Sequence, residues 1–209
     1  ARIGEVARRL RRDGRVLYSL DLVAGLPGQD AASFRDSFDR VHGLSPHRLQ
    51  VEFLKVLPGT RLEQRPDLRH DPRPPYEVRS TDWMSGEELD RIRCLEAVVE
   101  RFYNGRGRSG WGGGGDEFRR TMALLQEAHP SPHDLFLDLG LAMASRIDRR
   151  RGVPFEDRYR LVLEYAASLA CRPGFRLPAD WFPRVRVALR DDYAAQWRPG
   201  LPPPDRIGL

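Results

Sequence analysis

The chain has 209 residues, 40% of them hydrophobic and 31% charged, so it can form one moderate core or two small ones and has the composition of a soluble protein. Its apolar runs are too short to span a membrane and no signal peptide is visible, which excludes a membrane protein and leaves a cytoplasmic location as the expectation. The net charge is +5, but the arginines are interleaved with acids, as in Arg35-Asp36 and Asp39-Arg40, which is typical of solvated surfaces and makes RNA binding only the weaker alternative.

Residues 1–14 have the pattern of an amphipathic helix, with Val6 and Leu10 four positions apart and Gly14 as a C-terminal stop. The chain begins at Ala1 without a Met and is already inside this pattern, so we expect a piece cut from a longer protein. This helix would precede the first strand of the fold.

A short apolar run from Val16 to Ala24 predicts a strand that is buried on both faces, and it stops at a Gly-Leu-Pro-Gly turn. Asp30 is a suitable N-cap for a helix over residues 31–42. A second apolar run, residues 49–60, ends in the same kind of turn. This order predicts a βαβ unit with parallel strands, whose carboxyl ends form the edge where the active sites of such layers lie.

The two runs, D-L-V-A-G-L-P-G-Q-D at residues 21–30 and L-Q-V-E-F-L-K-V-L-P-G-T at residues 49–60, resemble the fifth and sixth strands of the radical S-adenosylmethionine (SAM) barrel. The closest likeness is to cobalamin-binding radical SAM proteins, and a more distant one is to oxygen-independent coproporphyrinogen oxidases. The resemblance implies an α/β fragment of a partial TIM-like barrel, with SAM, a 4Fe-4S cluster and cobalamin as cofactors. It also implies that the adenosine pocket is lined by Val23, Ala24, Gly25, Leu54, Lys55 and Val56.

The chemistry of these positions suits an adenosine wall. Adenine needs a flat apolar surface and backbone groups for its edge, and a glycine such as Gly25 lets the main chain approach closely. The alternative is that Gly25, Gly28 and Gly59 only form turns.

Glu52 is a charged residue inside the second strand, in the same alternation phase as Gln50 and Leu54. A charge within a barrel strand is costly unless it is paired or faces a wet cavity. We therefore expect these three residues to face the barrel interior, where polar groups would meet SAM, substrate or cobalamin. The alternative is an edge strand with solvated charges.

Residues 66–84 are polar and rich in proline, which predicts a linker with a short extended segment. Within and beyond it, P-P-Y-E-V-R-S-T-D-W-M-S at residues 74–85 and E-x-V-V-E-R-F-Y-N-G at residues 96–105 resemble the helical C-terminal domain of unknown function that accompanies cobalamin-binding radical SAM proteins. Residues 1–65 would then be the C-terminal part of the barrel, and residues 85–209 an all-α bundle.

The spacing of apolar residues in this second part predicts a series of helices. A capping box at Ser85 begins the first helix, which Asn104-Gly105 closes. Its apolar stripe consists of Leu89, Ile92, Leu95, Val98, Val99 and Phe102. Further helices are expected over residues 116–127, 132–149, 155–169 and 183–196.

Cys94 and Cys171 are the only cysteines, which excludes a disulfide framework. The radical SAM family holds its cluster with a C-x-x-x-C-x-x-C loop, which is absent here, so the resemblance implies that the cluster ligands and the cobalamin domain lie upstream. His129 and His133 lack a third converging ligand, and we expect no metal ligand and no catalytic residue in this chain. The G-x-G-x-x-G match at residues 105–110 follows a helix instead of a strand, which predicts a flexible loop.

The sequence thus predicts the C-terminal portion of a cobalamin-dependent radical SAM enzyme, with part of the SAM pocket wall and a helical cap. Its partners would be the missing N-terminal part of the same protein and a small-molecule substrate that the sequence does not identify. Alone it would be inactive. A non-catalytic binding or scaffold module is the alternative from a different class.

Overall fold

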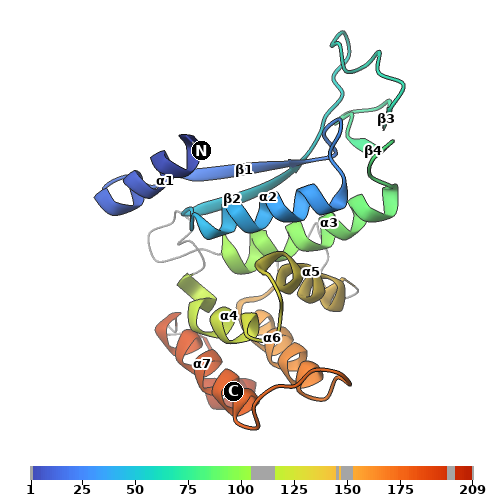
Figure 1. Ribbon diagram of the computed structural model, residues 1–209. Coiled ribbons are helices and arrows are strands. Elements are labelled where there is room, and N and C mark those ends of the chain that lie inside the picture. The colour runs from blue at the N-terminus through green and yellow to red at the C-terminus, as the bar shows by residue number, and fades with distance from the viewer. Residues whose placement is uncertain (1, 105–115, 145, 147–152, 197–200, 209) are drawn as a thin grey trace.

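The computed structural model in Figure 1 describes residues 2–104, 116–144, 146, 153–196 and 201–208. The glycine-rich match at residues 105–110 lies outside the described residues. None of the described helices is both long enough and apolar enough to cross a membrane.

The chain opens with the predicted helix, α1 (Arg2–Asp13), which ends at Gly14 with a φ of 65°. Such a positive φ favours glycine, so Gly14 ends the helix as the sequence predicted. Of the α1 side chains only Ala7 is buried, whereas Ile3 and Val6 are exposed. α1 lies beyond the beginning of the first strand (Figure 1).

The predicted βαβ unit is confirmed. β1 (Ser19–Ala24) pairs in parallel with β2 (Arg48–Phe53), and α2 (Ala31–Gly43) connects them. Asp30 caps α2 as expected, because its carboxylate accepts from the backbone N–H of Ser33 at 2.8 Å and the Ser33 hydroxyl accepts from the Asp30 N–H. The strand begins at Ser19, so the residues from Val16 to Tyr18 are not part of it.

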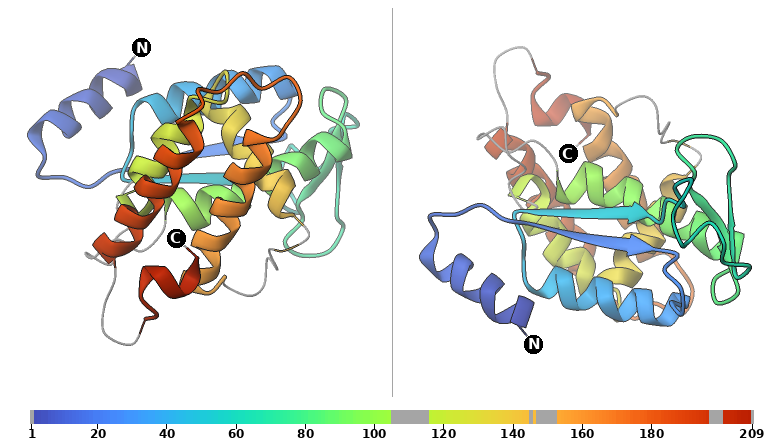
Figure 2. Two further views of the ribbon diagram at one scale, coloured as in Figure 1. Left: turned by 90° about the horizontal axis from the view of Figure 1, so that it is seen from below. Right: turned by 90° about the horizontal axis from the view of Figure 1, so that it is seen from above.

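Only one face of this two-stranded sheet is covered, so the prediction that the first strand is buried on both faces is wrong. In β2 the alternate residues Leu49, Val51 and Phe53 are buried, while Gln50 is half-buried and Glu52 is exposed. α2 and α3 (Gly86–Val98) lie beneath the sheet, and in the view from above no described segment lies over the two strands (Figure 2). The strands are buried on the side where helices pack and open on the other.

The segment expected as a linker carries a second small sheet. β3 (Leu68–His70) and β4 (Val78–Thr81) pair antiparallel, with an irregularity between Arg69 and His70. Just before β4, Glu77 forms an isolated bridge with Lys55, which attaches this hairpin to the end of the first sheet.

From Gly86 onward, every regular element that the structure describes is helical. A capping box between Ser85 and Glu88 begins α3, as predicted, and a π-helical turn, η1 (Val99–Tyr103), ends it. The remaining elements are η2 (Asp116–Phe118), α4 (Arg119–Gln126), α5 (Pro132–Met143), α6 (Phe155–Ala170), α7 (Trp181–Gln196) and η3 (Pro204–Ile207). The whole is a mixed α/β protein with more helix than strand.

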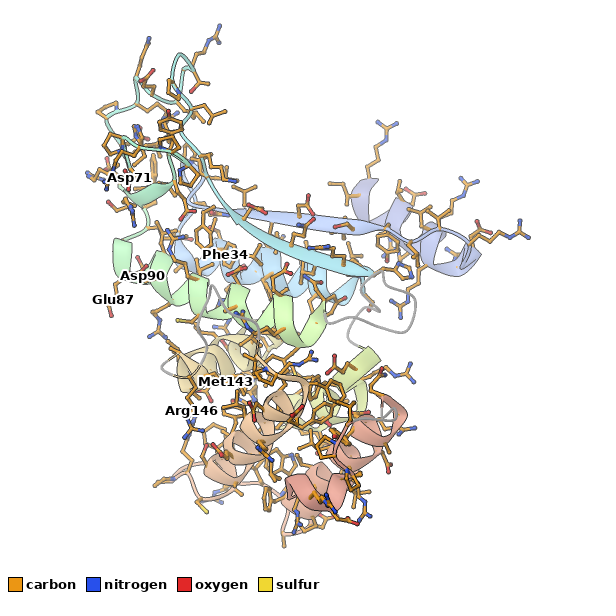
Figure 3. The ribbon with its side chains drawn as sticks, turned by 180° about the vertical axis from the view of Figure 1, so that it is seen from behind. Phe34, Asp71, Glu87, Asp90, Met143 and Arg146 are labelled. Carbon is orange, nitrogen blue, oxygen red and sulfur yellow. The ribbon has the colours of Figure 1, made fainter. Side chains whose placement is uncertain are left out.

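A single hydrophobic core joins the sheet to the helices. The predicted α3 stripe is buried throughout, and the core extends from Ala24 in β1 to Tyr193 in α7. Phe34 of α2 lies fully buried within it, whereas Glu87 at the beginning of α3 points away from the molecule (Figure 3). The sheet and the helical part therefore share the apolar area that stabilises both.

Candidate functional site

The candidate site is the edge where both parallel strands end. Val23 is the register partner of Glu52, Ala24 is the partner of Phe53, and the Leu54 N–H donates to the Ala24 carbonyl at 3.0 Å. The two sequence motifs are therefore neighbours in space, as the βαβ prediction required. We call this edge the strand-end rim: Val23, Ala24, Gly25, Glu52, Leu54, Lys55 and Val56.

Gln29 fixes the turn that follows β1. Its side-chain carbonyl accepts from the backbone N–H groups of Gly25 at 2.9 Å and Leu26 at 3.3 Å, and its amide donates to the Val23 carbonyl at 3.1 Å. Gly25 has a φ of 83°, and an added Cβ there would lie 2.6 Å from Cγ1 of Val78. Both the conformation and the close approach require glycine.

Replacing Gln29 with Ala is expected to lower the free energy of unfolding by about 1–3 kcal/mol, because the buried Gly25 N–H loses its partner. Urea denaturation followed by circular dichroism would measure the change. Gln64→Ala is the matched control, since Gln64 is exposed and has no hydrogen bond within the described part of the chain, and it should change stability by no more than about 0.5 kcal/mol. Equal effects of the two substitutions would contradict the assigned role of Gln29.

The end of β2 is also tied down by backbone hydrogen bonds. The Leu54 carbonyl accepts from the Val78 N–H at 2.8 Å, and the Val56 N–H donates to the Tyr76 carbonyl at 2.8 Å. These groups, like the Gly25 N–H, are already paired within the chain. They are not open to the edge of an adenine ring in this structure.

The rim residues therefore divide into two sets. Ala24, Gly25, Leu54 and Val56 are buried and form the body of the rim. Val23 is half-buried, and the side chains of Glu52 and Lys55 are 50% and 47% exposed, with 3.7 Å between the carboxylate and the ammonium nitrogen. The rim side chains that a ligand could contact are therefore the apolar Val23 and the ion pair of Glu52 and Lys55.

Gly25, Gly28 and Gly59 all have a positive φ; Gly28 and Gly59 lie in turns and Gly25 lies at a bend directly after β1. Glu52 shares the uncovered face of the sheet with Val23, its register partner, and this face is opposite to the helices. Both alternatives for Glu52 predict this position, because a barrel interior and the solvated face of an edge strand would each lie on the side away from the helices.

Two residues that support β2 were missed from the sequence, Asn104 near the start of the strand and Arg93 at its end, beside the rim. The side-chain amide of Asn104 bonds both the N–H of Leu49, at 3.0 Å, and the Leu49 carbonyl, at 2.7 Å, so it occupies the outer edge of β2. Arg93 of α3 lies 4.1 Å from the centre of the Phe53 ring and pairs with Glu77. Neither has a local signal, because each partner is distant in the sequence.

Cysteine and histidine side chains are the residue types best suited to bind a metal such as zinc. Cys94 lies on α3 and Cys171 at the end of α6, and among the described residues no three Asp, Glu, His or Cys side chains come together as metal ligands. The ring of His129 contacts the Leu125 carbonyl at 2.8 Å and the Tyr165 hydroxyl at 2.9 Å. This histidine is a buried member of a polar network.

The comparisons with known proteins address the second part of the chain. The family described as "Protein of unknown function (DUF4080)" matches residues 67–195, which run from just before β3 almost to the end of α7. Neither a curated protein nor a solved structure gives a significant match to the chain. Since the matched residues make up more than half of its length, the chain belongs to the DUF4080 family of proteins of unknown function.

Proposed function

We propose that the chain is the C-terminal portion of a cobalamin-dependent radical SAM enzyme, in which the first sheet forms the last strands of a partial barrel and the helices form a cap. The observation that carries the proposal is the open parallel sheet at the N-terminal side of the DUF4080 domain. Domains of this family accompany cobalamin-binding radical SAM proteins, which agrees with the resemblance of residues 21–30 and 49–60 to their barrel strands.

The open sheet supports the proposal through its unequal edges. Asn104 bonds the outer edge of β2 at Leu49 and Val78 bonds Leu54 just past the end of β2, but among the described residues no strand pairs with the outer edge of β1. Parallel sheets are normally covered on both faces, and two strands alone are marginal in water. Further parallel strands added at β1 would complete a barrel wall.

In that barrel the accessible rim residues would face SAM. Val23 would supply the apolar contact for adenine, Glu52 would accept from the ribose hydroxyls, and Lys55 would balance a carboxylate. Reductive cleavage of SAM at a 4Fe-4S cluster supplies a 5'-deoxyadenosyl radical in such enzymes, and this chemistry belongs to the cofactors. The chain would hold the nucleoside, orient it and exclude water.

The cluster itself does not fit the residues of this chain. Three thiolates are required, and the chain has only Cys94 and Cys171, on different helices. The cluster ligands would have to come from another part of the parent protein, and the isolated chain should not cleave SAM.

The full-length parent protein tests the proposal. After reconstitution with iron and sulfide without oxygen, it should release 5'-deoxyadenosine from SAM when dithionite is added. In the same protein Glu52→Gln and Lys55→Gln should each weaken SAM binding by about tenfold, because a charged hydrogen-bond partner is lost. Calorimetric titration with SAM would measure the dissociation constants.

Asp36→Asn is the matched control, because Asp36 is exposed on α2 and its carboxylate has no partner in the described part of the chain. It should leave SAM binding unchanged. A parent protein that carries an intact cluster by its absorption spectrum and still releases no 5'-deoxyadenosine would refute the enzyme and favour the scaffold alternative.

A further inference from the structure

A cavity of about 340 Å³ lies at the other end of the sheet, where the strands begin. Its walls come from the end of α1, the end of α2, η1, α4 and α5. Ser45, which lines it, belongs to the loop that leads into β2, so the cavity is separated from the strand-end rim by the length of the strands. Its size is that of a small-molecule site.

The cavity has an aromatic wall. The rings of Phe102, Tyr103, His42 and Phe136 line it, with 5.5 Å between the centres of His42 and Tyr103 and 5.6 Å between those of His42 and Phe136. Burial lowers the pKa of His42, and the nearby Asp39 carboxylate opposes that shift only in part. Burial thus favours the uncharged form of the His42 ring, which adds to the apolar surface.

The cavity also has a cationic rim. Arg11 and Arg119 line it from α1 and α4, and none of the described lining residues is Asp or Glu. Arg11 is held in place because it donates to the Ser45 carbonyl at 2.7 Å, which leaves its other N–H groups available. Arg119 is exposed and forms no ion pair within the described residues. Most arginines for which the structure gives a partner are paired with acids, so two arginines at one cavity with no acidic side chain among its described lining residues form an unusual concentration of positive charge.

From these features we propose that the cavity binds a small organic anion: an aromatic or other apolar body against the rings of the wall, and a phosphate or carboxylate held by Arg11 and Arg119. Guanidinium groups are suited to both anions because they donate two parallel hydrogen bonds. Because an inorganic anion has no apolar part to contact the aromatic wall, we expect it to bind more weakly than an organic anion. This inference does not depend on the proposed radical SAM function, since the two sites share no residue.

The test uses 1-naphthyl phosphate as the probe, titrated into the full chain by calorimetry, with amide NMR shifts to locate it. Binding should be saturable, with the shifts centred on η1 and α4. The double variant Arg11→Gln/Arg119→Gln should bind at least about tenfold more weakly, because two charge-assisted contacts are lost. Inorganic phosphate and neutral 1-naphthol should each bind at least about tenfold more weakly than the probe, since each lacks one half of the recognition.

The matched control is Arg12→Gln/Arg186→Gln, which removes the same charge from exposed positions outside the cavity and should bind the probe as the unaltered chain does. Ala123→Trp, at an exposed lining position, should block the cavity without touching either arginine. The proposal is overturned if the probe does not bind, if 1-naphthol or inorganic phosphate binds as tightly as the probe, if the control pair weakens binding equally, or if Ala123→Trp has no effect.

Discussion

Replacing Gly140 with Ala is expected to destabilise the protein by about 2–3 kcal/mol, because this glycine is where α5 crosses α3 at closest approach. A Cβ at Gly140 would lie 2.4 Å from the Cys94 carbonyl oxygen and 2.6 Å from its carbonyl carbon. Both are main-chain atoms of a helix and cannot rotate away. The helices would have to separate, and the apolar contacts between them would loosen.

Alanine favours a helix over glycine by about 1 kcal/mol, so the substitution destabilises only if the steric cost is larger than this gain. Gly43→Ala at the end of α2 is the matched control, since no atom lies within 4 Å of its added Cβ and the change should be neutral or slightly stabilising. Urea denaturation would give both free energies of unfolding. A Gly140→Ala variant as stable as the unaltered chain would show that the two helices do not pack this closely.

The sequence predicts well those features whose signals are local. The caps at Asp30 and Ser85 each consist of residues three positions apart, and both form as expected. The apolar stripe of α3 is buried because its spacing matches the helical repeat. The parallel pairing of β1 and β2 follows from a strand, helix, strand order that leaves few other connections.

Features that depend on distant partners could not be predicted. Val16 and Leu17 are apolar residues of the predicted strand but lie outside β1, which begins at Ser19. Just before β1, the Tyr18 carbonyl accepts from the backbone N–H of His47, a residue distant in the sequence. The hairpin of β3 and β4 is short and proline-flanked, so it has too little alternation to be recognised. Pairing in these places is decided by tertiary contacts, to which single-residue preferences contribute little.

The two candidate sites also differ in how far local sequence signals predict them. The motifs placed the rim residues side by side, but whether the backbone of Gly25 or Leu54 is free depends on Gln29 and on Val78. The anion cavity has no motif at all, since Arg11 and Arg119 are far apart in the sequence and line the same cavity only in the folded chain. Charge counting suggested solvated arginines and gave no reason to single out these two.

Replacing Arg158 with Met is expected to cost about 3–5 kcal/mol of stability at pH 8, since it leaves the carboxylate of Glu117 buried without its counter-charge. The guanidinium nitrogen lies 2.9 Å from the carboxylate oxygen, and the side chains are 17% and 3% exposed. Burial raises the pKa of Glu117, and Arg158 opposes this shift. Without Arg158 the pKa should therefore rise further above that of the unfolded chain.

The direction of the pH dependence follows from that pKa. When Glu117 has a higher pKa in the folded state than in the unfolded state, the folded state binds more protons between the two values, and stability falls as the pH rises through this range. The loss caused by Arg158→Met should thus be larger at pH 8 than at pH 5. Adding Glu117→Gln to Arg158→Met should restore part of the stability at pH 8 and remove the additional pH dependence.

Arg184 provides the matched comparison, because it forms an ion pair with Glu127 at 3.0 Å in which both side chains are 42% exposed. An exposed pair contributes about 0–1 kcal/mol, so Arg184→Met should cost little and equally at both pH values. Urea denaturation of all the variants at pH 5 and pH 8 makes the comparison. If Arg158→Met costs no more than Arg184→Met, or costs the same at both pH values, then the Glu117 carboxylate is not held in a buried, paired state, and the contact between η2 and α6 has another basis.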